Sequence, residues 1–195
     1  MSSRKSRIQR TTRETDINLV LGLDGDGMAD IDTGIGFYDH MLTALARHGR
    51  FDLELTCDGD LEVDDHHTVE DCALALGRGF HDALGDRRGI ERFGHAYAPL
   101  DEALARAVVD LSGRPYSVVE LGLRREALGG LACENVAHVF RSFATEARAA
   151  VHIDVLRGDN DHHRAEAAFK AFAIALRKAV ALSGRDEVPS TKGVL

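Results

Sequence analysis

The feature that most constrains this chain is a His-His-x-x-Glu pattern that occurs twice. The first copy is His66-His67-Thr68-Val69-Glu70, and the second is His162-His163-Arg164-Ala165-Glu166. Each copy leads into an alanine-rich run with helical periodicity, which places both patterns in the first turn of a predicted helix. The copies lie 96 residues apart. A period of that size indicates two related halves rather than a solenoid of short repeats.

Helix geometry decides which of these side chains can share a metal ion. His66 and Glu70 are four residues apart, as are His162 and Glu166, so each pair lies on one helix face and could hold one ion. The neighbouring His67 points well away from that face, because one residue advances the side chain by about 100°. We therefore expect each helix to serve two ions, or one ion and a residue that supports its ligands.

A third histidine repeats upstream in each half. His40 and His138 lie 98 residues apart, each within a predicted helix. The repeated positions give six imidazoles and two carboxylates, or three and one for each of two ions. Such a donor set suits Mn, Fe, Co, Ni or Zn and disfavours calcium. The metal-ligand candidates are His40, His66, His67, Glu70, His138, His162, His163 and Glu166.

Hydrophobic periodicity predicts the elements of the first half. An alternating apolar run interrupted by Asp24-Gly25-Asp26-Gly27 predicts a hairpin over 16–34, and helical spacing follows over 36–48. A second hairpin is expected over 51–63, before a helix that runs from His66 towards Gly85. The basic residues near the N-terminus are expected to form a solvated tail.

The second half is expected to repeat this order with one strand missing. The predicted elements are strands at 102–111, 116–123 and 151–155 and helices at 134–150 and 162–182. The expected fold is a single α+β domain, 1–195, of two β-β-α-β-β-α halves, about 10–92 and about 93–195. Each half would be an antiparallel sheet covered on one face by two helices.

Composition narrows the class of protein. With 195 residues and 44% hydrophobic content, the chain can bury an ordinary core without disulfides. Cys57, Cys72 and Cys133 are interpreted as small core residues, which favours a reducing, cytoplasmic setting. No signal peptide or membrane span is expected. The net charge of −8 argues against a nucleic-acid partner.

A second group of residues has the chemistry of an anion site. Arg92 and Arg114 stand near glycines, Lys170 lies one helical turn beyond Glu166, and the tail carries Ser190 and Lys192. Guanidinium groups, an ammonium, hydroxyls and glycine-flanked amides are what phosphate recognition uses. Taken singly, each of these residues could equally be an ordinary solvated charge or part of a loose chain end.

Five segments of the chain can be compared with known families: GIGFYDHM at 34–41, DDHHTVED at 64–71, DLSGRP at 110–115, NDHHRAE at 160–166 and PSTKG at 189–193. Together they resemble the imidazoleglycerol-phosphate dehydratases of histidine biosynthesis. The resemblance extends from about Arg7 onward, without the phosphatase domain fused to this enzyme in some organisms. It implies a fold like domain 2 of ribosomal protein S5.

The resemblance implies a lyase that converts D-erythro-imidazoleglycerol phosphate to imidazoleacetol phosphate. It also implies two Mn²⁺ per subunit on the eight candidate ligands, and a homo-oligomer of 24 subunits built from trimers, with active sites between subunits. Arg92, Arg114, Ser190 and Lys192 match positions that hold the substrate phosphate, with Lys170 as a helper. Glu14 matches a glutamate that contacts the substrate.

The expected mechanism passes through a metal-bridged imidazolate and a diazafulvene-like intermediate, which acidifies the carbon that loses its proton. Glu14 and Glu166 are the candidates for proton transfer, with Asp101 or Glu102 as substitutes. Two other functions remain open from the residues alone. A dimetal hydrolase of phosphate esters would use a metal-bound water and a carboxylate-rich shell. A metal-storage assembly would have no need of a phosphate site.

Overall fold

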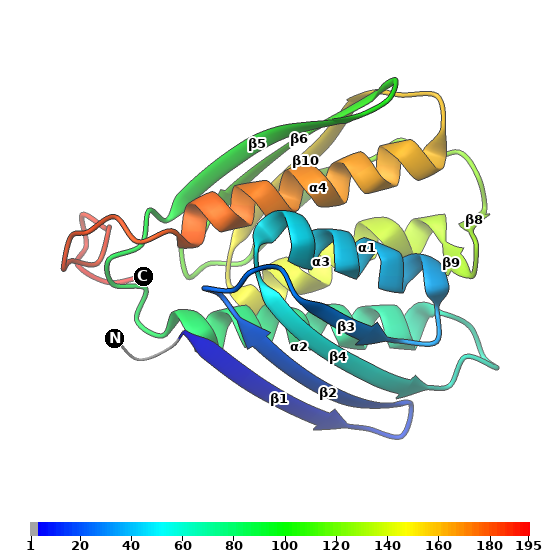
Figure 1. The fold of residues 1–195 in the computed structure, drawn as a ribbon, viewed down its shortest axis with the longest axis horizontal. Coiled ribbons are helices and arrows are strands. Elements are labelled where there is room, and N and C mark those ends of the chain that lie inside the picture. Colours follow the sequence, from blue (N-terminus) through cyan, green and yellow to red (C-terminus); the bar gives the residue numbers. More distant parts are fainter. Residues whose placement is uncertain (1–3) are drawn as a thin grey trace.

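Two four-stranded sheets enclose a layer of four helices in the computed structural model, which describes residues 4–195 (Figure 1). The elements of the first half are β1 (Lys5–Thr11), β2 (Thr15–Gly22), β3 (Ala29–Asp32), α1 (Gly36–Gly49), β4 (Asp52–Gly59) and α2 (His66–Leu84). Those of the second half are β5 (Phe93–Leu100), β6 (Ala103–Asp110), β7 (Tyr116–Glu120), β8 (Ala127–Leu128), β9 (Leu131–Ala132), α3 (Cys133–Ala147), β10 (Ala150–Arg157) and α4 (Asp161–Val180).

The two halves share one topology. The sheets have the strand orders β1-β2-β4-β3 and β5-β6-β10-β7, and the small β8-β9 hairpin is an addition in the second half. The α+β class, the duplication and the two helices for each sheet are therefore confirmed. The expected order within a half is wrong, because three strands rather than two precede the first helix. The sheets are also mixed, since β3 runs parallel to β4 and β7 parallel to β10.

The glycine-rich turn after β2 explains the first error. The sequence predicts a hairpin there, but β4 lies between β2 and β3. The carboxylate of Asp52, at the start of β4, accepts hydrogen bonds from the N–H groups of Asp26 (3.0 Å) and Met28 (3.1 Å). The turn is thereby held against β4, β3 continues on the far side, and α1 makes the crossover that a parallel pair requires.

Three further strand predictions fail for identifiable reasons. The expected hairpin over 51–63 is β4 alone, because Leu61 and Val63 lie in an exposed turn. The expected N-terminal tail is the edge strand β1, whose Ile8 packs on the core. Strand β5 was missed because its inward positions are small. A Cβ at Gly94 would lie 1.9 Å from the carbonyl oxygen of Ala175 on α4, so only glycine allows this approach.

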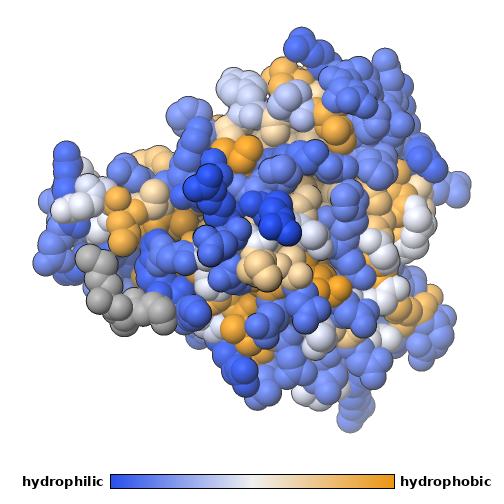
Figure 2. Space-filling model, viewed as in Figure 1, coloured by the Kyte–Doolittle hydropathy of each residue, from blue (hydrophilic) through white to orange (hydrophobic). Residues whose placement is uncertain are grey.

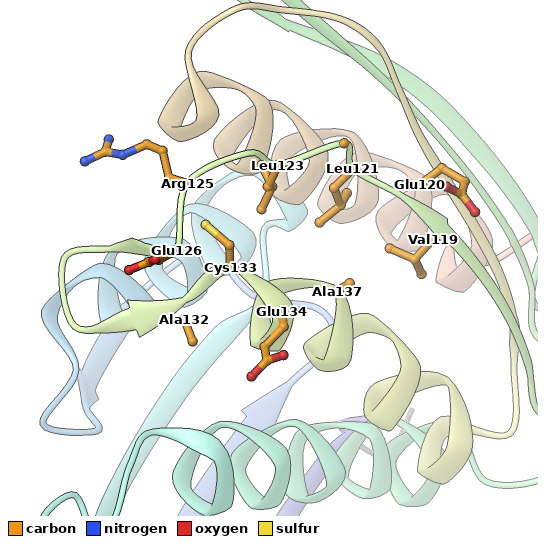
Figure 3. Close-up of a pocket in the computed structure, with 11 residues that line it drawn as sticks. Val119, Glu120, Leu121, Leu123, Arg125, Glu126, Ala132, Cys133, Glu134 and Ala137 are labelled. Atoms are coloured by element: carbon orange, nitrogen blue, oxygen red, sulfur yellow. The ribbon is translucent and has the colours of Figure 1, made fainter.

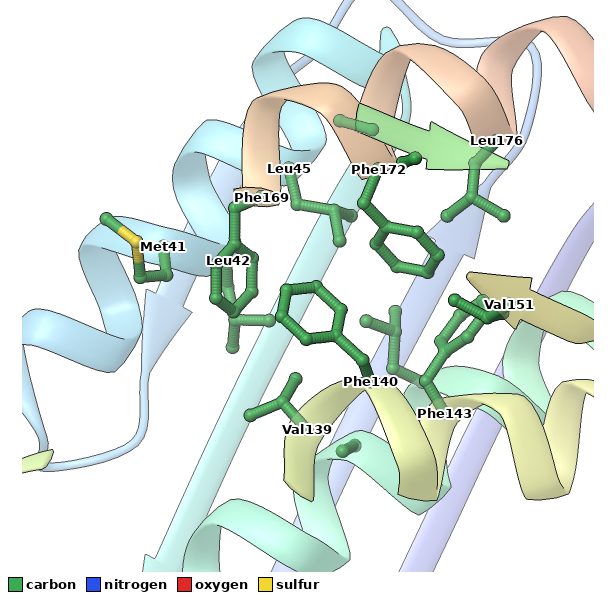
Figure 4. Close-up of a cluster of buried hydrophobic side chains, with 14 of the residues drawn as sticks. Met41, Leu42, Leu45, Val139, Phe140, Phe143, Val151, Phe169, Phe172 and Leu176 are labelled. Atoms are coloured by element: carbon green, nitrogen blue, oxygen red, sulfur yellow. The ribbon is translucent and has the colours of Figure 1, made fainter. Parts of the chain in front are cut away.

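The core lies within the helix layer and joins the halves. Helix α1 packs on α4, and α2 packs on α3, so each contact pairs one helix from each half. Figure 4 shows phenylalanines of α3 and α4 meeting at the centre. The ring centroid of Phe140 lies 4.7 Å from that of Phe169 and 5.3 Å from that of Phe172. The two halves therefore share a single hydrophobic core.

All four helices begin at the same end of the molecule (Figure 1). The C-terminal tail, from residue 181 onward, lies at the opposite end. Helix α4 has 20 residues and is therefore about 30 Å long. The face in Figure 2 is largely hydrophilic, with hydrophobic residues in scattered groups. Within residues 4–195, no helix is both long enough and apolar enough to span a membrane.

Candidate active site

The first group of candidate metal ligands joins the two halves. His40 comes from the second turn of α1, whereas His162 and Glu166 come from the first turns of α4. The Oε2 atom of Glu166 lies 3.3 Å from Nε2 of His40 and 3.1 Å from Nε2 of His162. The predicted pairing of His162 with Glu166 is present, and the packing of α1 on α4 adds the third ligand.

The second group is the counterpart of the first, with the halves exchanged. His66 and Glu70 come from α2, and His138 comes from α3. Nε2 of His66 lies 3.7 Å from Oε2 of Glu70, and Nε2 of His138 lies 3.4 Å from Oε1. The rings of His66 and His138 are stacked, with their centroids 5.0 Å apart.

Both groups fit a divalent metal ion. The ligand atoms within each group all lie within 4.8 Å of one another. Two atoms bound at right angles, each about 2.1 Å from one ion, would be about 3 Å apart. Nε2 of His138 is buried and has no hydrogen-bond partner, which is the state expected of an atom reserved for a ligand. Two imidazoles and one carboxylate suit a borderline ion and leave coordination positions open.

Glu166 is held in its charged form. Burial by itself raises the pKa of this carboxyl, but the ion pair with Lys170 and hydrogen bonds from His40 and His162 lower it to about 2. The Nζ atom of Lys170 lies 2.6 Å from Oε1. A carboxylate with so low a pKa is a good metal ligand and a weak proton acceptor, which favours the first of the two roles predicted for Glu166.

His67 and His163 point away from the groups of their own chain. Nδ1 of His67 lies 3.0 Å from Oδ2 of Asp60, and Nδ1 of His163 lies 2.7 Å from Oε2 of Glu102. These contacts raise the pKa of both imidazoles. The Nε2 atom of His67 lies 3.8 Å from Oε1 of Glu14, beyond hydrogen-bond distance. Each group within the chain thus contains three of the four ligands expected for one ion.

Glu14 and Glu102 occupy equivalent positions, immediately before β2 and β6. The side chain of Glu14 is 52% exposed. Glu102 instead accepts hydrogen bonds from the backbone N–H groups of Asn160 (2.8 Å) and Asp159 (3.0 Å). The N–H of Asn160, the imidazole of His163 and the N–H of Asp159 lower the pKa of Glu102 to about 2. Of the two glutamates, only Glu14 has a free carboxylate.

Most of the predicted phosphate residues lie far from the metal ligands of the same chain. The N–H of Arg92 donates to the carbonyl of Ala179, near the C-terminus of α4, whereas His162 lies at the N-terminus. The length of α4 therefore separates them by roughly 25 Å. The guanidinium of Arg92 binds Asp110 (Nε to Oδ1, 2.7 Å) and the carbonyl of Pro189 (2.8 Å).

Arg114 and the tail lie at this same end of the second sheet. The turn before β7 contains Arg114, and a Cβ at Gly113 in that turn would lie 2.6 Å from the carbonyl carbon of Leu195. In the tail, Oγ of Ser190 accepts a hydrogen bond of 3.2 Å from the N–H of Lys192. Lys170 does not join this set, because it is paired with Glu166.

The pocket in Figure 3 has a volume of about 580 Å³. Its wall includes Leu121, Arg125 and Glu126 from the segment after β7, and Cys133 and Glu134 from the first turn of α3. None of the eight candidate metal ligands lines it.

Comparison with known proteins places the chain in a family. The sequence model of imidazoleglycerol-phosphate dehydratase matches residues 33–176. The chain belongs to the imidazoleglycerol-phosphate dehydratase family. It is 58% identical to the Candida glabrata enzyme over 206 aligned residues, which cover 96% of this chain and 98% of the relative. It is 59% identical to the Salinibacter ruber enzyme, with 100% and 96% covered.

Solved structures of imidazoleglycerol-phosphate dehydratases share the fold. The Pyrococcus furiosus enzyme gives a TM-score of 0.84 at 38% identity and covers 96% of this chain and 100% of its own. The Staphylococcus aureus enzyme gives 0.80 at 38% identity, with 91% and 99% covered. Membership in this family confirms the expected lyase class and the place in histidine biosynthesis. It also decides against the phosphate-ester hydrolase and the storage assembly.

Sequence reasoning missed the residues that hold the histidines of this dehydratase. Asp60 lies in the hairpin predicted over 51–63 and Asn135 in the helix predicted over 134–150, and neither is among the predicted site residues. Asn135 accepts a hydrogen bond at Oδ1 from Nδ1 of His66 (3.2 Å), and its amide donates to Asp65 (3.0 Å). The sequence contains no periodic pattern that joins Asn135 to His66, because the contact exists only where α3 packs on α2.

Proposed function

We propose that this chain dehydrates D-erythro-imidazoleglycerol phosphate to imidazoleacetol phosphate in the cytoplasm, with two Mn²⁺ ions per subunit. The observation that carries the proposal is the pair of three-ligand groups that the helix layer builds at one end of the molecule. Family membership supplies the reaction. The donor set of imidazole and carboxylate supports the choice of a borderline divalent ion.

Six residues would hold the ions from within one chain. Bound metal ions would supply the positive charge that stabilises negative charge on the substrate imidazole. Glu70 and Glu166 each provide the negative ligand of a group. The metal ligands of a single chain are His40, His66, Glu70, His138, His162 and Glu166.

Glu14 is the proposed proton acceptor. The reaction removes the hydroxyl next to the imidazole ring and a proton from the following carbon, so it needs a base with an available carboxylate. Glu14 has one, and it lies beside His67. Both are at the end of the molecule where the four helices begin and the candidate ligands lie, called the metal end. Glu166 is paired with Lys170, and Glu102 is bound to His163 and two backbone amides. Those contacts support the assignment of Glu14 over both.

The site is proposed to form between subunits. The end that carries Arg92, Arg114 and the tail, called the phosphate end, is roughly 25 Å from the metal end of the same chain. One small phosphate ester cannot span that distance. Neither ligand group of the chain includes His67 or His163, whose Nε2 atoms lie 3.8 Å and 3.9 Å from carboxylate oxygens, beyond hydrogen-bond distance. We therefore assign Arg92, Arg114, Ser190 and Lys192 to the phosphate of a substrate held at a neighbouring copy, in the homo-oligomer of 24 subunits built from trimers.

The test combines metal analysis with turnover. Purified protein should contain about two ions per chain and should dehydrate imidazoleglycerol phosphate. Removal of the ions by a chelator should abolish turnover, and return of Mn²⁺ should restore both metal content and activity in step. Turnover that survives complete removal of the metal would refute the role of the ions.

A further inference from the structure

We propose that Asp60 and Glu102 are positioning residues that hold the Nδ1 proton of His67 and His163, and so direct the bare Nε2 of each imidazole towards an ion of a neighbouring subunit. The proposal rests on the proposed function, because it concerns the two histidines that no ligand group of their own chain includes. Neither carboxylate belongs to the eight candidate metal ligands.

The chemistry of a carboxylate fixes the tautomer of His67. Both oxygens of Asp60 face Nδ1 of His67, at 3.1 Å and 3.0 Å. An ionised carboxylate can only accept a hydrogen bond, so Nδ1 must carry the proton. The lone pair of the neutral ring is then on Nε2, which lies 3.8 Å from Oε1 of Glu14, beyond hydrogen-bond distance. Histidines that bind metals commonly donate their other N–H to a carboxylate in this way.

Glu102 does the same for His163 and is itself anchored. Its Oε2 lies 2.7 Å from Nδ1 of His163, and its Oε1 accepts the N–H groups of Asp159 and Asn160, just before α4. Glu102 therefore joins the β5-β6 turn to the start of the helix that carries His163. A side chain with three such contacts holds the imidazole in one orientation.

His66 provides an internal comparison, because it belongs to a ligand group of its own chain. Its Nδ1 is held by Oδ1 of Asn135, and its Nε2 faces Glu70. The amide of Asn135 is fixed in turn by Asp65. A held Nδ1 and an available Nε2 therefore occur together at His66, where the ligand atom can be identified from the structure. His67 and His163 have the same arrangement, with the partner ion outside the chain.

The duplicated halves use different residues for this purpose. Gly59-Asp60 and Gly158-Asp159 are equivalent, as are Glu14 and Glu102. In the first half Asp60 holds the imidazole, which leaves Glu14 free. In the second half Glu102 holds the imidazole, and Asp159 contributes only its N–H. The halves have thus diverged so that one of two equivalent glutamates orients a ligand and the other is available for proton transfer.

The test measures Mn²⁺ binding by the full-length protein after dialysis, with free Mn²⁺ followed by electron paramagnetic resonance. Asp60→Ala and Glu102→Ala should each raise the Kd for Mn²⁺ by about 10–100-fold at one of the two kinds of site. Asp60→Asn and Glu102→Gln keep an acceptor oxygen and should recover most of the affinity. Glu62→Gln is the matched control, at an exposed turn residue without a contact to either imidazole, and should bind Mn²⁺ like the wild type.

The outcomes separate the two proposals. Wild-type Kd values in both alanine variants would overturn the positioning role, and so would amide variants as weak as the alanine variants. Either result leaves the dehydratase function standing if the wild type binds Mn²⁺ and turns over. A wild type that binds no Mn²⁺ would instead overturn the proposed metal function. Thermal melting of each variant verifies that it folds. If Glu102→Ala does not fold, the comparison of Asp60→Ala with Asp60→Asn still tests the proposal, because the side chain of Asp60 makes fewer hydrogen bonds to the backbone than that of Glu102.

Discussion

At the scale of single residues, the contacts of a side chain decide its role more than its position in the repeat. Glu14 and Glu102 both precede the second strand of a half, yet one is exposed and the other is held by three hydrogen bonds. The carboxylates of Glu14 and Glu102 are chemically identical, but their different contacts suit them to different roles. The proposed general base, Glu14, is the glutamate that makes no such hydrogen bonds.

Replacement of Glu14 tests this assignment. Glu14→Gln should lower turnover by roughly 10²–10⁴-fold, because a positioned base contributes about that much to a rate. Manganese content and subunit assembly should stay unchanged, since Glu14 is not a proposed ligand. The measurement is kcat with metal analysis on the same sample, and Glu62→Gln is the control. Near-normal turnover would remove Glu14 from the mechanism.

Loss of His67 should have a different effect from loss of Glu14. His67→Ala should reduce the metal content and weaken association, because a ligand donated to a neighbouring copy couples binding to assembly. Metal analysis and sedimentation velocity measure the two effects. His95→Ala, at an exposed histidine of β5, is the control. A variant with full metal content would show that His67 is not a ligand.

At the scale of elements, close helix contacts place the ligands. His138 reaches the α2 ligands because α3 packs closely on α2, and Gly77 lies at that contact. A Cβ at Gly77 would lie 2.5 Å from the carbonyl oxygen of Phe143 and 2.9 Å from the backbone nitrogen of Ala147. The helices can approach this closely only because residue 77 has no side chain.

Gly77→Ala should therefore destabilise the protein. Helix propensity alone predicts a gain of about 1 kcal/mol, but the added methyl must separate α2 from α3, at a cost of about 1–3 kcal/mol. The midpoint of denaturant unfolding, measured at fixed protein concentration, gives the sign of the change in the free energy of unfolding. Gly36→Ala is the matched control, since a Cβ there meets nothing within 4 Å. A midpoint above that of the wild type would contradict the close-contact account.

At the scale of the whole molecule, the helix layer separates the two parts of the proposed site. All four helices begin at the metal end, and the residues assigned to phosphate lie at the other end. Under the proposed assembly, a single chain would contribute these two parts to the sites of different neighbours.

Mixed assemblies test this arrangement. Glu14→Gln and Lys192→Ala should each lose activity, one at the metal end and one at the phosphate end. Subunits of the two variants assembled together should regain up to about a quarter of wild-type turnover, because random mixing pairs intact ends at some interfaces. The activity of separately purified variants, combined without subunit exchange, is the control. No recovery in verified mixed assemblies would place both residues in one chain's site.

The sequence by itself determined the α+β class, the duplication and the pairing of His66 with Glu70 and of His162 with Glu166. These are local or periodic properties, which the spacing of residues along a helix expresses directly. It did not determine the strand order, because the turn at 24–27 does not specify which strand its neighbours will join.

Only the tertiary structure decided which helices join in one group of candidate ligands. His40 joins α4 and His138 joins α2, although each lies closer in sequence to the helix of its own half. It also selected Asp60, Glu102 and Asn135 as the partners of the histidines. The physical reason is that these groupings come from the packing of one half on the other, and contacts between distant segments leave no regular spacing in the chain.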